Sequence, residues 1–337
     1  MSVTLREIAE STGYTEATVS NAINNRGRMS EQTRQIILER AREMGYSPNN
    51  SARSLAARHS GEIGIVIPNI DNPFYSRMVS KITMFCREAG YESIFADSYE
   101  NMETEIEAVS RMVSRRVEGL LIAPVNHSIS LADYLPMLEM NHVKYMFISN
   151  CLPGREVPYV MTDLRKAAEI VTDHLLDNGR QKLGLFIGQD KNPVSSQRLD
   201  GYRQAFCRHG IDLGQAVQIV CDRYNYEEGY IRTKELISSG RKIEAIIAIN
   251  DFMAAGAETA LNECSVRIPD DIAIAGYDDL FFSKMLLSPL TTVRQDIELM
   301  SRIAVEKLIS MIESDTQTTE NILLTPELII RASTEGH

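Results

Sequence analysis

Small and polar side chains on one short segment near the N-terminus have the chemistry to address nucleic acid. The residues with enough reach for base edges or phosphates are Thr15, Glu16, Ala17, Ser20 and Asn21. An asparagine can pair with adenine, and a glutamate can accept a hydrogen bond from cytosine. Arg26 and Arg28, in the polar loop that follows, suit phosphates and would carry no sequence information. The segment therefore predicts an element that reads DNA.

A second set of polar and aromatic residues follows predicted strands in the rest of the chain. Asp71, Asn72 and Phe74 combine acceptors with an aromatic ring, which suits a ligand with one apolar face and a hydroxylated rim. Arg198 can hold adjacent hydroxyls or a carboxylate with its planar fork. Further acceptors follow two later predicted strands, at Asn250-Asp251 and Tyr277-Asp278-Asp279.

Each of these residues also has a purely structural interpretation. Asn72 and Asp251 could cap the helices that begin next to them. Arg198 could bridge a helix to a sheet, and Phe74 could belong to the core.

Motifs for metal, phosphate or nucleophile chemistry are absent from the sequence. It contains no G-x-x-x-x-G-K-[ST], no G-x-G-x-x-G after a strand, no G-x-S-x-G and no H-E-x-x-H. The six histidines lack metal-ligand spacing, and the five cysteines are widely spaced without a C-x-x-C. Asp251 and Asp278 can be imagined as an acid–base pair, but nothing marks them as one. We therefore expect no metal, no cofactor and no enzymatic activity.

Three predicted helices position the DNA-reading segment. Thr4-Leu5-Arg6-Glu7 is a capping box, so a helix is expected from about Leu5 to Ser11. Gly13 suits the tight turn, Thr15 can cap a second helix through Ile23, and Ser30 can cap a third that ends near Gly45. The spacing of Ala9, Gly13 and Val19 fits two crossed helices, as in a helix-turn-helix. The alternative is three small helices that pack together without touching DNA.

From residue 61 onward, apolar strands alternate with amphipathic helices. The first elements are expected at Glu62–Pro68, Phe74–Ala89, Ser93–Ala96, Glu103–Arg115 and Gly119–Pro124. This alternation predicts parallel sheets with helices on both faces.

A weak internal repeat predicts two such α/β units. Ile63–Ile67 is similar to Leu183–Ile187, and Glu118–Ala123 is similar to Glu244–Ile249. Ligands of such sheets bind beyond the carboxyl ends of the strands. The cleft between the two units is therefore the expected pocket.

Charge is divided unevenly along the 337 residues. The net charge is -11, yet residues 1–60 carry eight arginines and six acids, so this part is basic and the remainder is strongly acidic. An acidic body would confine contact with a phosphate backbone to the N-terminal part; the acidity could also be no more than a solubilising surface. No run of about 18 apolar residues and no export signal is seen, so we expect a cytoplasmic protein without membrane contact.

Several runs together resemble the lactose-repressor (LacI/GalR) family of bacterial transcription regulators. They are Val3–Ala9, Ala17–Asn24, Met44–Asn49 and Ala52–Leu55, and the similarity spans essentially the whole chain. The resemblance implies an all-α helix-turn-helix DNA-binding domain and a two-lobed α/β domain, similar to periplasmic binding proteins, with two Rossmann-like parallel sheets. It implies domains at 1–49, 50–60 (a hinge helix) and 61–337. Within the last, one lobe is expected at about 61–160 and 291–318, the other at about 161–290 and 319–337.

The resemblance also assigns site residues. Leu55 would wedge into the minor groove from a hinge helix that orders on operator binding, since nine residues are too few for a stable helix in water; alternatively, it is a linker leucine. The full DNA-binding set is Thr4, Thr15, Glu16, Ala17, Thr18, Ser20, Asn21, Asn24, Arg28, Asn49, Ala52, Arg53, Leu55 and Ala56. The effector-binding set is Asp71, Asn72, Phe74, Ser149, Arg198, Tyr224, Asn225, Asp251 and Asp278. Relatives often carry an aspartate at the strand end where this chain reads Ile148-Ser149-Asn150.

The sequence thus predicts a homodimeric regulator, expected to be a repressor, that binds a pseudo-palindromic operator. A sugar or sugar derivative in the cleft is expected to control it. A solute-binding transport component and an α/β enzyme acting on a sugar are the alternatives. Residues 1–58 argue against the first, and the missing acid–base pair argues against the second.

Overall fold

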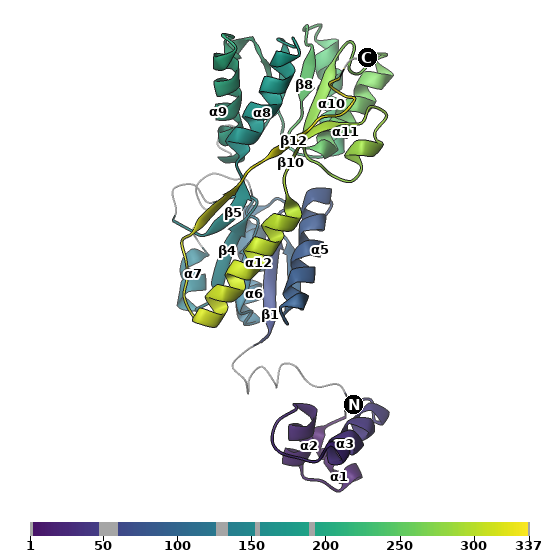
Figure 1. The fold of residues 1–337 in the computed structure, drawn as a ribbon, viewed down its shortest axis with the longest axis vertical. Coiled ribbons are helices and arrows are strands. Elements are labelled where there is room, and N and C mark those ends of the chain that lie inside the picture. The colour runs from purple at the N-terminus through teal and green to yellow at the C-terminus, as the bar shows by residue number, and fades with distance from the viewer. Residues whose placement is uncertain (1–2, 47–59, 126–133, 152–155, 189–192, 336–337) are drawn as a thin grey trace. The chain divides into compact units, whose positions relative to one another are not determined.

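The computed structural model describes residues 3–46, 60–125, 134–151, 156–188 and 193–335 (Figure 1). The chain forms two compact units, Met1–Ser60 and Gly61–His337. Each unit is described separately below.

The N-terminal unit is a bundle of three short helices, α1 (Leu5–Thr12), α2 (Glu16–Ile23) and α3 (Glu31–Glu43). The side chains of Thr4, Thr15 and Ser30 cap them, each accepting a hydrogen bond from a backbone amide in the first turn. Thr4 and Glu7 form the complete capping box. The predicted helices and caps are therefore confirmed.

A small apolar core holds the three helices together. Its buried members are Ile8, Ala9, Val19, Ala22, Ile37 and Ala41. Gly13 has a φ of 75°, which lets the chain turn sharply between α1 and α2. The packing leaves Glu16, Ala17 and Asn21 exposed on α2.

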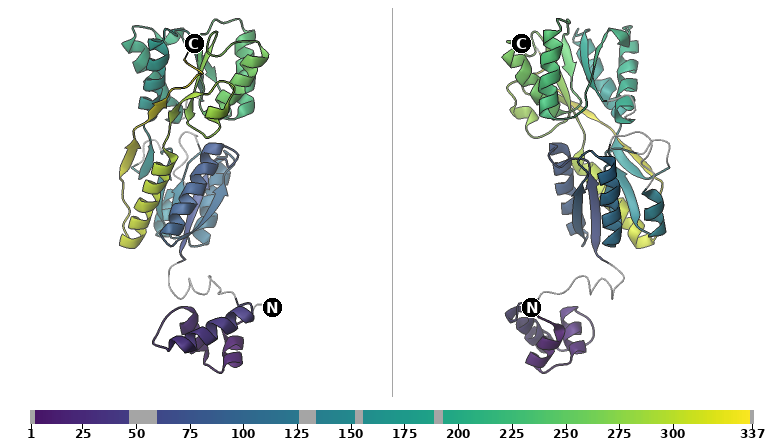
Figure 2. Two further views of the ribbon diagram at one scale, coloured as in Figure 1. Left: turned by 45° about the vertical axis from the view of Figure 1, so that its right-hand side comes forward. Right: turned by 180° about the vertical axis from the view of Figure 1, so that it is seen from behind.

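Two six-stranded sheets form the second unit (Figure 2). The first has the order β11-β5-β4-β3-β1-β2, and the second has the order β12-β10-β9-β8-β6-β7. Their strands are β1 (Glu62–Ile67), β2 (Glu92–Asp97), β3 (Gly119–Ile122), β4 (Lys144–Ile148), β5 (Tyr159–Thr162), β6 (Leu183–Ile187), β7 (Val217–Val220), β8 (Ala245–Ile247), β9 (Ala273–Asp278), β10 (Thr291–Arg294), β11 (Asn321–Leu324) and β12 (Glu327–Ile329). All described pairings are parallel except β10 with β12.

Helices cover both faces of each sheet, as the alternating pattern predicts. In the first lobe, α5 (Pro73–Glu88) and α12 (Ile297–Ser314) pack on one face, and α6 (Met102–Ser114) and α7 (Leu135–Met140) on the other. In the second lobe, α8 (Leu164–Asp177) and α9 (Pro193–Arg208) pack opposite α10 (Tyr226–Ser238) and α11 (Asp251–Glu263). Short 3-10 turns lie at Leu213–Gln215 and Ser283–Met285.

The internal repeat is reproduced in the strand order. The run β5-β4-β3-β1-β2 in one lobe matches β10-β9-β8-β6-β7 in the other. Strands β1 and β6, whose sequences are similar, occupy equivalent places, as do β3 and β8. Two copies of one α/β arrangement therefore make up this unit.

The chain passes between the lobes three times, and the expected lobe boundaries are wrong at two passages. Strand β10, expected in the first lobe within 291–318, pairs with β9 in the second. Strand β11, expected in the second lobe within 319–337, pairs with β5 in the first. The passages therefore lie after β5, between β10 and α12, and between β11 and β12. Long-range backbone pairing places these short strands, and their local sequence does not reveal the partner.

Candidate functional site

The DNA-reading surface expected on α2 is present as an exposed polar face. Glu16, Ala17 and Asn21 are exposed, whereas Val19 and Ala22 are buried in the bundle. The face therefore leaves side chains free to reach base edges in a major groove.

Other residues assigned to DNA already have partners inside the unit. The Thr15 and Thr18 hydroxyl oxygens lie 2.9 Å apart, and the Asn24 amide donates to the Ser20 carbonyl at 2.8 Å. Thr4 is the cap of α1, and Arg28 is exposed in the loop after α2. The hinge assignments, Asn49, Ala52, Arg53, Leu55 and Ala56, lie outside the described residues.

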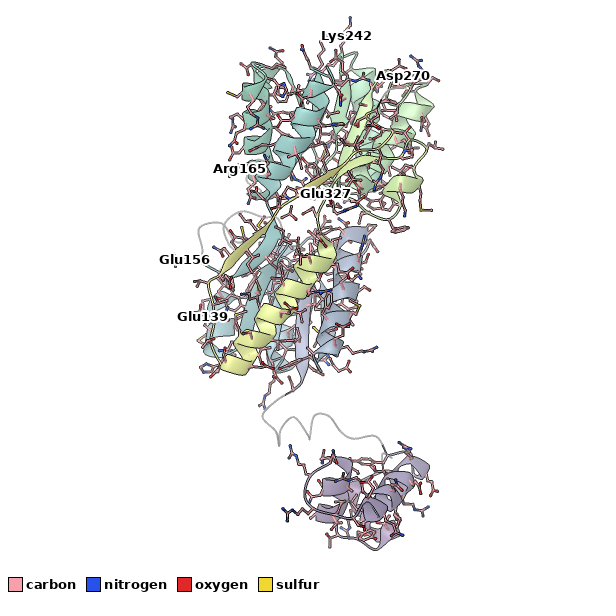
Figure 3. All side chains as sticks on the ribbon, in the orientation of Figure 1. Glu139, Glu156, Arg165, Lys242, Asp270 and Glu327 are labelled. Atoms are coloured by element: carbon pink, nitrogen blue, oxygen red, sulfur yellow. The ribbon has the colours of Figure 1, made fainter. Side chains whose placement is uncertain are left out.

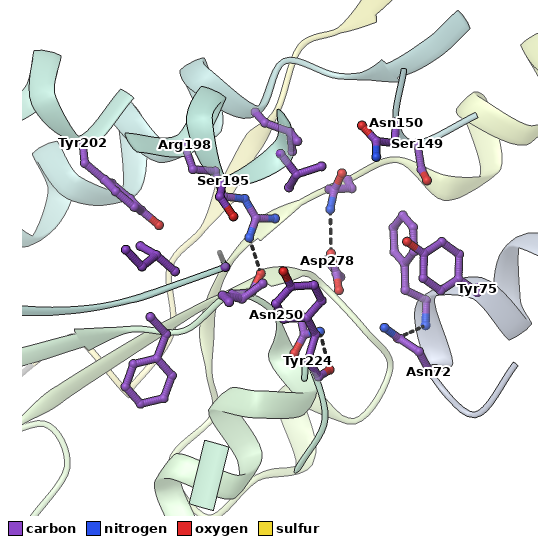
Figure 4. A pocket seen from close by; sticks show the side chains of 18 residues that line it. Asn72, Tyr75, Ser149, Asn150, Ser195, Arg198, Tyr202, Tyr224, Asn250 and Asp278 are labelled. Atoms are coloured by element: carbon purple, nitrogen blue, oxygen red, sulfur yellow. Dashed lines mark hydrogen bonds between the residues drawn. The ribbon is translucent and has the colours of Figure 1, made fainter. Parts of the chain in front are cut away.

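A cavity lies at the carboxyl ends of the strands of both lobes (Figure 4). It encloses about 730 Å³ including its opening to solvent, which falls in the usual range for small-molecule sites. The first lobe lines it with Asn72, Phe74, Tyr75, Ser149 and Asn150. The second lobe and its passage to α12 supply Arg198, Tyr202, Tyr224, Asn250, Asp278, Gln295 and the apolar remainder. The strand-end rule therefore locates the cavity correctly.

Of the nine residues assigned to an effector, the structure brings six together in this cavity: Asn72, Phe74, Ser149, Arg198, Tyr224 and Asp278. Asp71, Asn225 and Asp251 do not line it. Asp71 is exposed, and Asn225 caps α10 by accepting from the Glu228 amide. These three assignments are corrected.

Asp251 is a buried structural residue. Its carboxylate accepts hydrogen bonds from the Leu280 amide, the Ser283 hydroxyl and the Thr292 hydroxyl at 2.9, 2.5 and 2.6 Å. The cap of α11 is the preceding residue, Asn250. Full burial raises the pKa of Asp251 to about 7. The imagined acid–base pair is therefore absent, because Asp251 faces the protein interior.

Arg198 projects from α9 into the cavity and is 7% exposed. One terminal nitrogen donates to the Ile249 carbonyl at 2.6 Å, and the guanidinium lies 4.1 Å from the centroid of the Tyr277 ring. The Tyr277 hydroxyl is fixed in turn, 3.1 Å from that of Tyr202. Arg198 therefore bridges helix and sheet, as the structural interpretation holds, and also faces the cavity.

Asp278 ends β9 at the edge of the cavity in an unusual backbone conformation. Its φ is 105°, a value that non-glycine residues rarely adopt. The Gln295 amide donates to its carboxylate at 2.6 Å. Burial and the neighbouring Asp251 carboxylate raise the pKa of Asp278 well above its usual range, and Arg198 partly offsets this.

The first-lobe wall of the cavity is neutral and partly aromatic. Asn72 caps α5, since its side-chain oxygen accepts from the Phe74 amide at 3.0 Å. Phe74 and Tyr75 pack edge to face with centroids 5.2 Å apart, and Phe74 is also part of the first-lobe core. The Tyr75 hydroxyl hydrogen-bonds to Ser149, and burial raises the pKa of Tyr75.

The committed site set omitted several residues of the cavity, notably Tyr75, Ser195, Asn250 and Gln295. Gln295 directly follows β10, so the strand-end rule could have found it. Gly188, which follows β6, carried no chemical signal. A Cβ there would collide with the Tyr224 hydroxyl and the Ser195 hydroxyl, so this wall requires glycine.

Neither a metal nor a membrane site is indicated in the described parts of the chain. No group of three or more His, Cys, Asp or Glu side chains there could hold a metal ion. The helices described there include none long and apolar enough to cross a membrane.

Comparison with known proteins places the chain in a family. The description "Bacterial regulatory proteins, lacI family" matches residues 4–49, and "Periplasmic binding protein-like domain" matches residues 172–334. The chain belongs to the lacI family of bacterial regulatory proteins. It is a DNA-binding transcriptional regulator, as the resemblance predicts.

Similar lacI-family proteins align over almost the whole chain. The transcriptional regulator DegA of Bacillus subtilis is 28% identical, with 99% of this chain and 98% of that protein covered. The ribose operon repressor of Escherichia coli strain K12 is 27% identical, with 98% and 99% covered. The purine-type repressor PurR of Photobacterium profundum is 26% identical, with 98% of each covered.

Solved lacI-family structures share the fold. The lac repressor dimer bound to operator and the anti-inducer ONPF has a TM-score of 0.87 at 26% identity, with both chains fully covered. The regulator CelR in complex with cellobiose has a TM-score of 0.73 at 25% identity, with 98% and 99% covered. The helix-turn-helix unit and the two-lobed α/β unit are therefore confirmed.

Proposed function

We propose that the protein is a transcriptional repressor that binds a pseudo-palindromic operator as a homodimer and responds to a sugar or sugar derivative in the cavity between its lobes. The observation that carries the proposal is the cavity at the strand ends, in a chain that also presents an exposed polar α2 face. Relatives named as repressors of ribose operons and a cellobiose complex support the sugar class. Because its partner is DNA, we infer a cytoplasmic location.

Control would operate through the lobes. A ligand that contacts both cavity walls favours one relative position of the lobes. In a dimer, a change in that position would separate the paired segments that follow the helix-turn-helix units, and Leu55 would lose its place in the minor groove. A differential affinity of a few kcal/mol between the two positions is enough for regulation.

Exposed apolar side chains support the dimer. Phe281, Met285 and Leu287 are 66%, 70% and 85% exposed and follow β9 within seven residues. Clustered exposed apolar residues of this kind are typical of a protein interface, here with a second copy of the chain. Sedimentation equilibrium should give twice the chain mass, and a monomer would contradict the proposal.

The DNA-binding part is tested by selecting duplexes from a random library with the full chain. We expect a two-fold symmetric consensus, and we expect affinity for it to fall steeply with salt while the preference over random DNA persists. A steep salt dependence without any preferred site would reduce the protein to a nonspecific binder.

The effector part is tested by a thermal-shift screen with neutral sugars, nucleosides and phosphorylated sugars, because a cavity ligand stabilises the fold by mass action. Arg198→Ala should abolish the response to a stabilising ligand and leave operator affinity unchanged. Loss of both functions together would contradict this division. Turnover of a bound sugar would instead favour the enzyme alternative.

A further inference from the structure

The charges of the cavity are few and come from one lobe. Among the residues that line it, only Arg198 and Asp278 carry ionisable acid or base groups of ordinary neutral-pH charge, and both belong to the second lobe. The polar first-lobe residues, Asn72, Ser149 and Asn150, are neutral. The character of the ligand therefore depends on how these two charges are compensated.

The Arg198 cation is buried without an anionic partner among the described residues. Its recorded contacts are the Ile249 carbonyl and the face of Tyr277, which are both uncharged. Its Nε has no hydrogen-bond partner although the atom is buried. A buried cation is costly unless it is paired, and an arginine fork matches the two oxygens of a carboxylate.

Asp278 is poorly placed to supply the missing negative charge. It accepts from Gln295 and has the buried Asp251 carboxylate as a neighbour. Both burial and that neighbour raise the pKa of Asp278, so a proton on this group is favoured. The cavity as a whole is therefore electropositive around Arg198.

The remaining polar atoms add donors more than acceptors. Asn72 uses its oxygen on the Phe74 amide, which leaves its amide nitrogen to donate. Asn250 uses both ends, accepting from the Met253 amide and donating to the Tyr224 carbonyl. A ligand rich in acceptor oxygens satisfies such a lining best.

We propose that the effector is a monosaccharide acid, and that its carboxylate binds to the guanidinium of Arg198. The neutral wall of Asn72, Phe74 and Tyr75 would contact the remaining hydroxyl and C–H groups of the sugar. This inference rests on the proposed function, because it names the ligand class of the same cavity.

The test uses sugars that differ only in the oxidation state of one carbon. Calorimetric titration of the full chain compares D-glucuronate and D-gluconate with D-glucose, and D-galacturonate with D-galactose. We expect at least one acid to bind about tenfold or more tightly than its neutral parent. Tighter binding of a neutral parent, or no binding by any of the three acids, overturns the inference. The proposed function fails separately, if the chain selects no DNA site and no probe of the wider screen stabilises it.

Two cavity variants give opposite signs. Arg198→Gln should bring the affinity ratio of acid to parent sugar close to one, whereas Asp278→Asn should raise it, because it removes a group that repels the ligand when ionised. Arg203→Gln is the matched control on the same helix, since Arg203 is exposed and paired only with Asp200 there. A ratio unchanged by Arg198→Gln overturns the inference. Should this variant not fold, the ratio measured for Arg198→Lys, which keeps the charge but loses the fork, must fall instead.

Discussion

Glu105 offers a test of the structure that depends on pH and not on any ligand. It lies on α6, fully buried in the first lobe, and accepts hydrogen bonds from the Val125 amide at 2.7 Å and the Tyr134 hydroxyl at 3.0 Å. These two partners come from opposite ends of the 126–133 segment. Burial raises the pKa of Glu105 from 4.5 to about 7, and the two hydrogen bonds offset only part of the effect.

The sign of the effect follows from proton linkage. Between pH 4.5 and about 7, the folded protein keeps the Glu105 proton that the unfolded chain releases. The free energy of unfolding should therefore fall as pH rises through this window and level off above it. A pKa difference of about 2.5 corresponds to roughly 3 kcal/mol. Glu105→Gln removes the titration and should abolish this part of the pH dependence.

The assay is urea unfolding followed by circular dichroism at pH 5 and pH 8. Relative to Glu105→Gln, the unchanged protein should lose about 3 kcal/mol on going from pH 5 to pH 8. Glu107→Gln, an exposed position on the same helix, is the control and should keep the pH dependence of the unchanged protein. Equal pH dependence in the unchanged protein and Glu105→Gln would refute the reasoning.

Three further outcomes are expected. Asn21→Ala should weaken binding to the selected operator by about 1–3 kcal/mol and leave binding to random DNA unchanged, as measured by fluorescence anisotropy; an equal loss on both DNAs would rule out base reading. Gly188→Ala should displace the Tyr224 hydroxyl and weaken ligand binding in calorimetry, and unchanged binding would show that the wall can yield. Asp279→Asn breaks the bond from Arg294 Nε at 2.8 Å and should lower the free energy of unfolding by about 1–3 kcal/mol, with no change expected if this pair contributes little.

The sequence was sufficient for those features that depend on local pattern. The caps Thr4, Thr15 and Ser30 were recognisable because a hydroxyl before a helical run has one strong local use. Strand β1 was recognisable as an apolar run because both faces of a central parallel strand are buried. The cavity followed from the rule that ligands gather at strand ends.

Features that depend on pairing or on the direction of one side chain were not predictable. Strands β10 and β11 are four residues each, and nothing in them specifies which sheet they join. Asn250 and Asp251 stand side by side after a strand, yet only Asn250 lines the cavity while Asp251 is directed into the interior. One residue of phase at a strand end decides between ligand contact and core.

The late strands have a consequence for synthesis of the protein on the ribosome. Both sheets stay incomplete until the final fifty or so residues emerge, because β10, β11 and β12 all lie between Thr291 and Ile329. The helix-turn-helix unit needs only contacts made within its own residues, so it can fold while the ribosome is still far from the stop codon. A nascent or prematurely terminated chain would thus present a DNA reader attached to two open-edged sheets, able to touch DNA but unable to answer a metabolite.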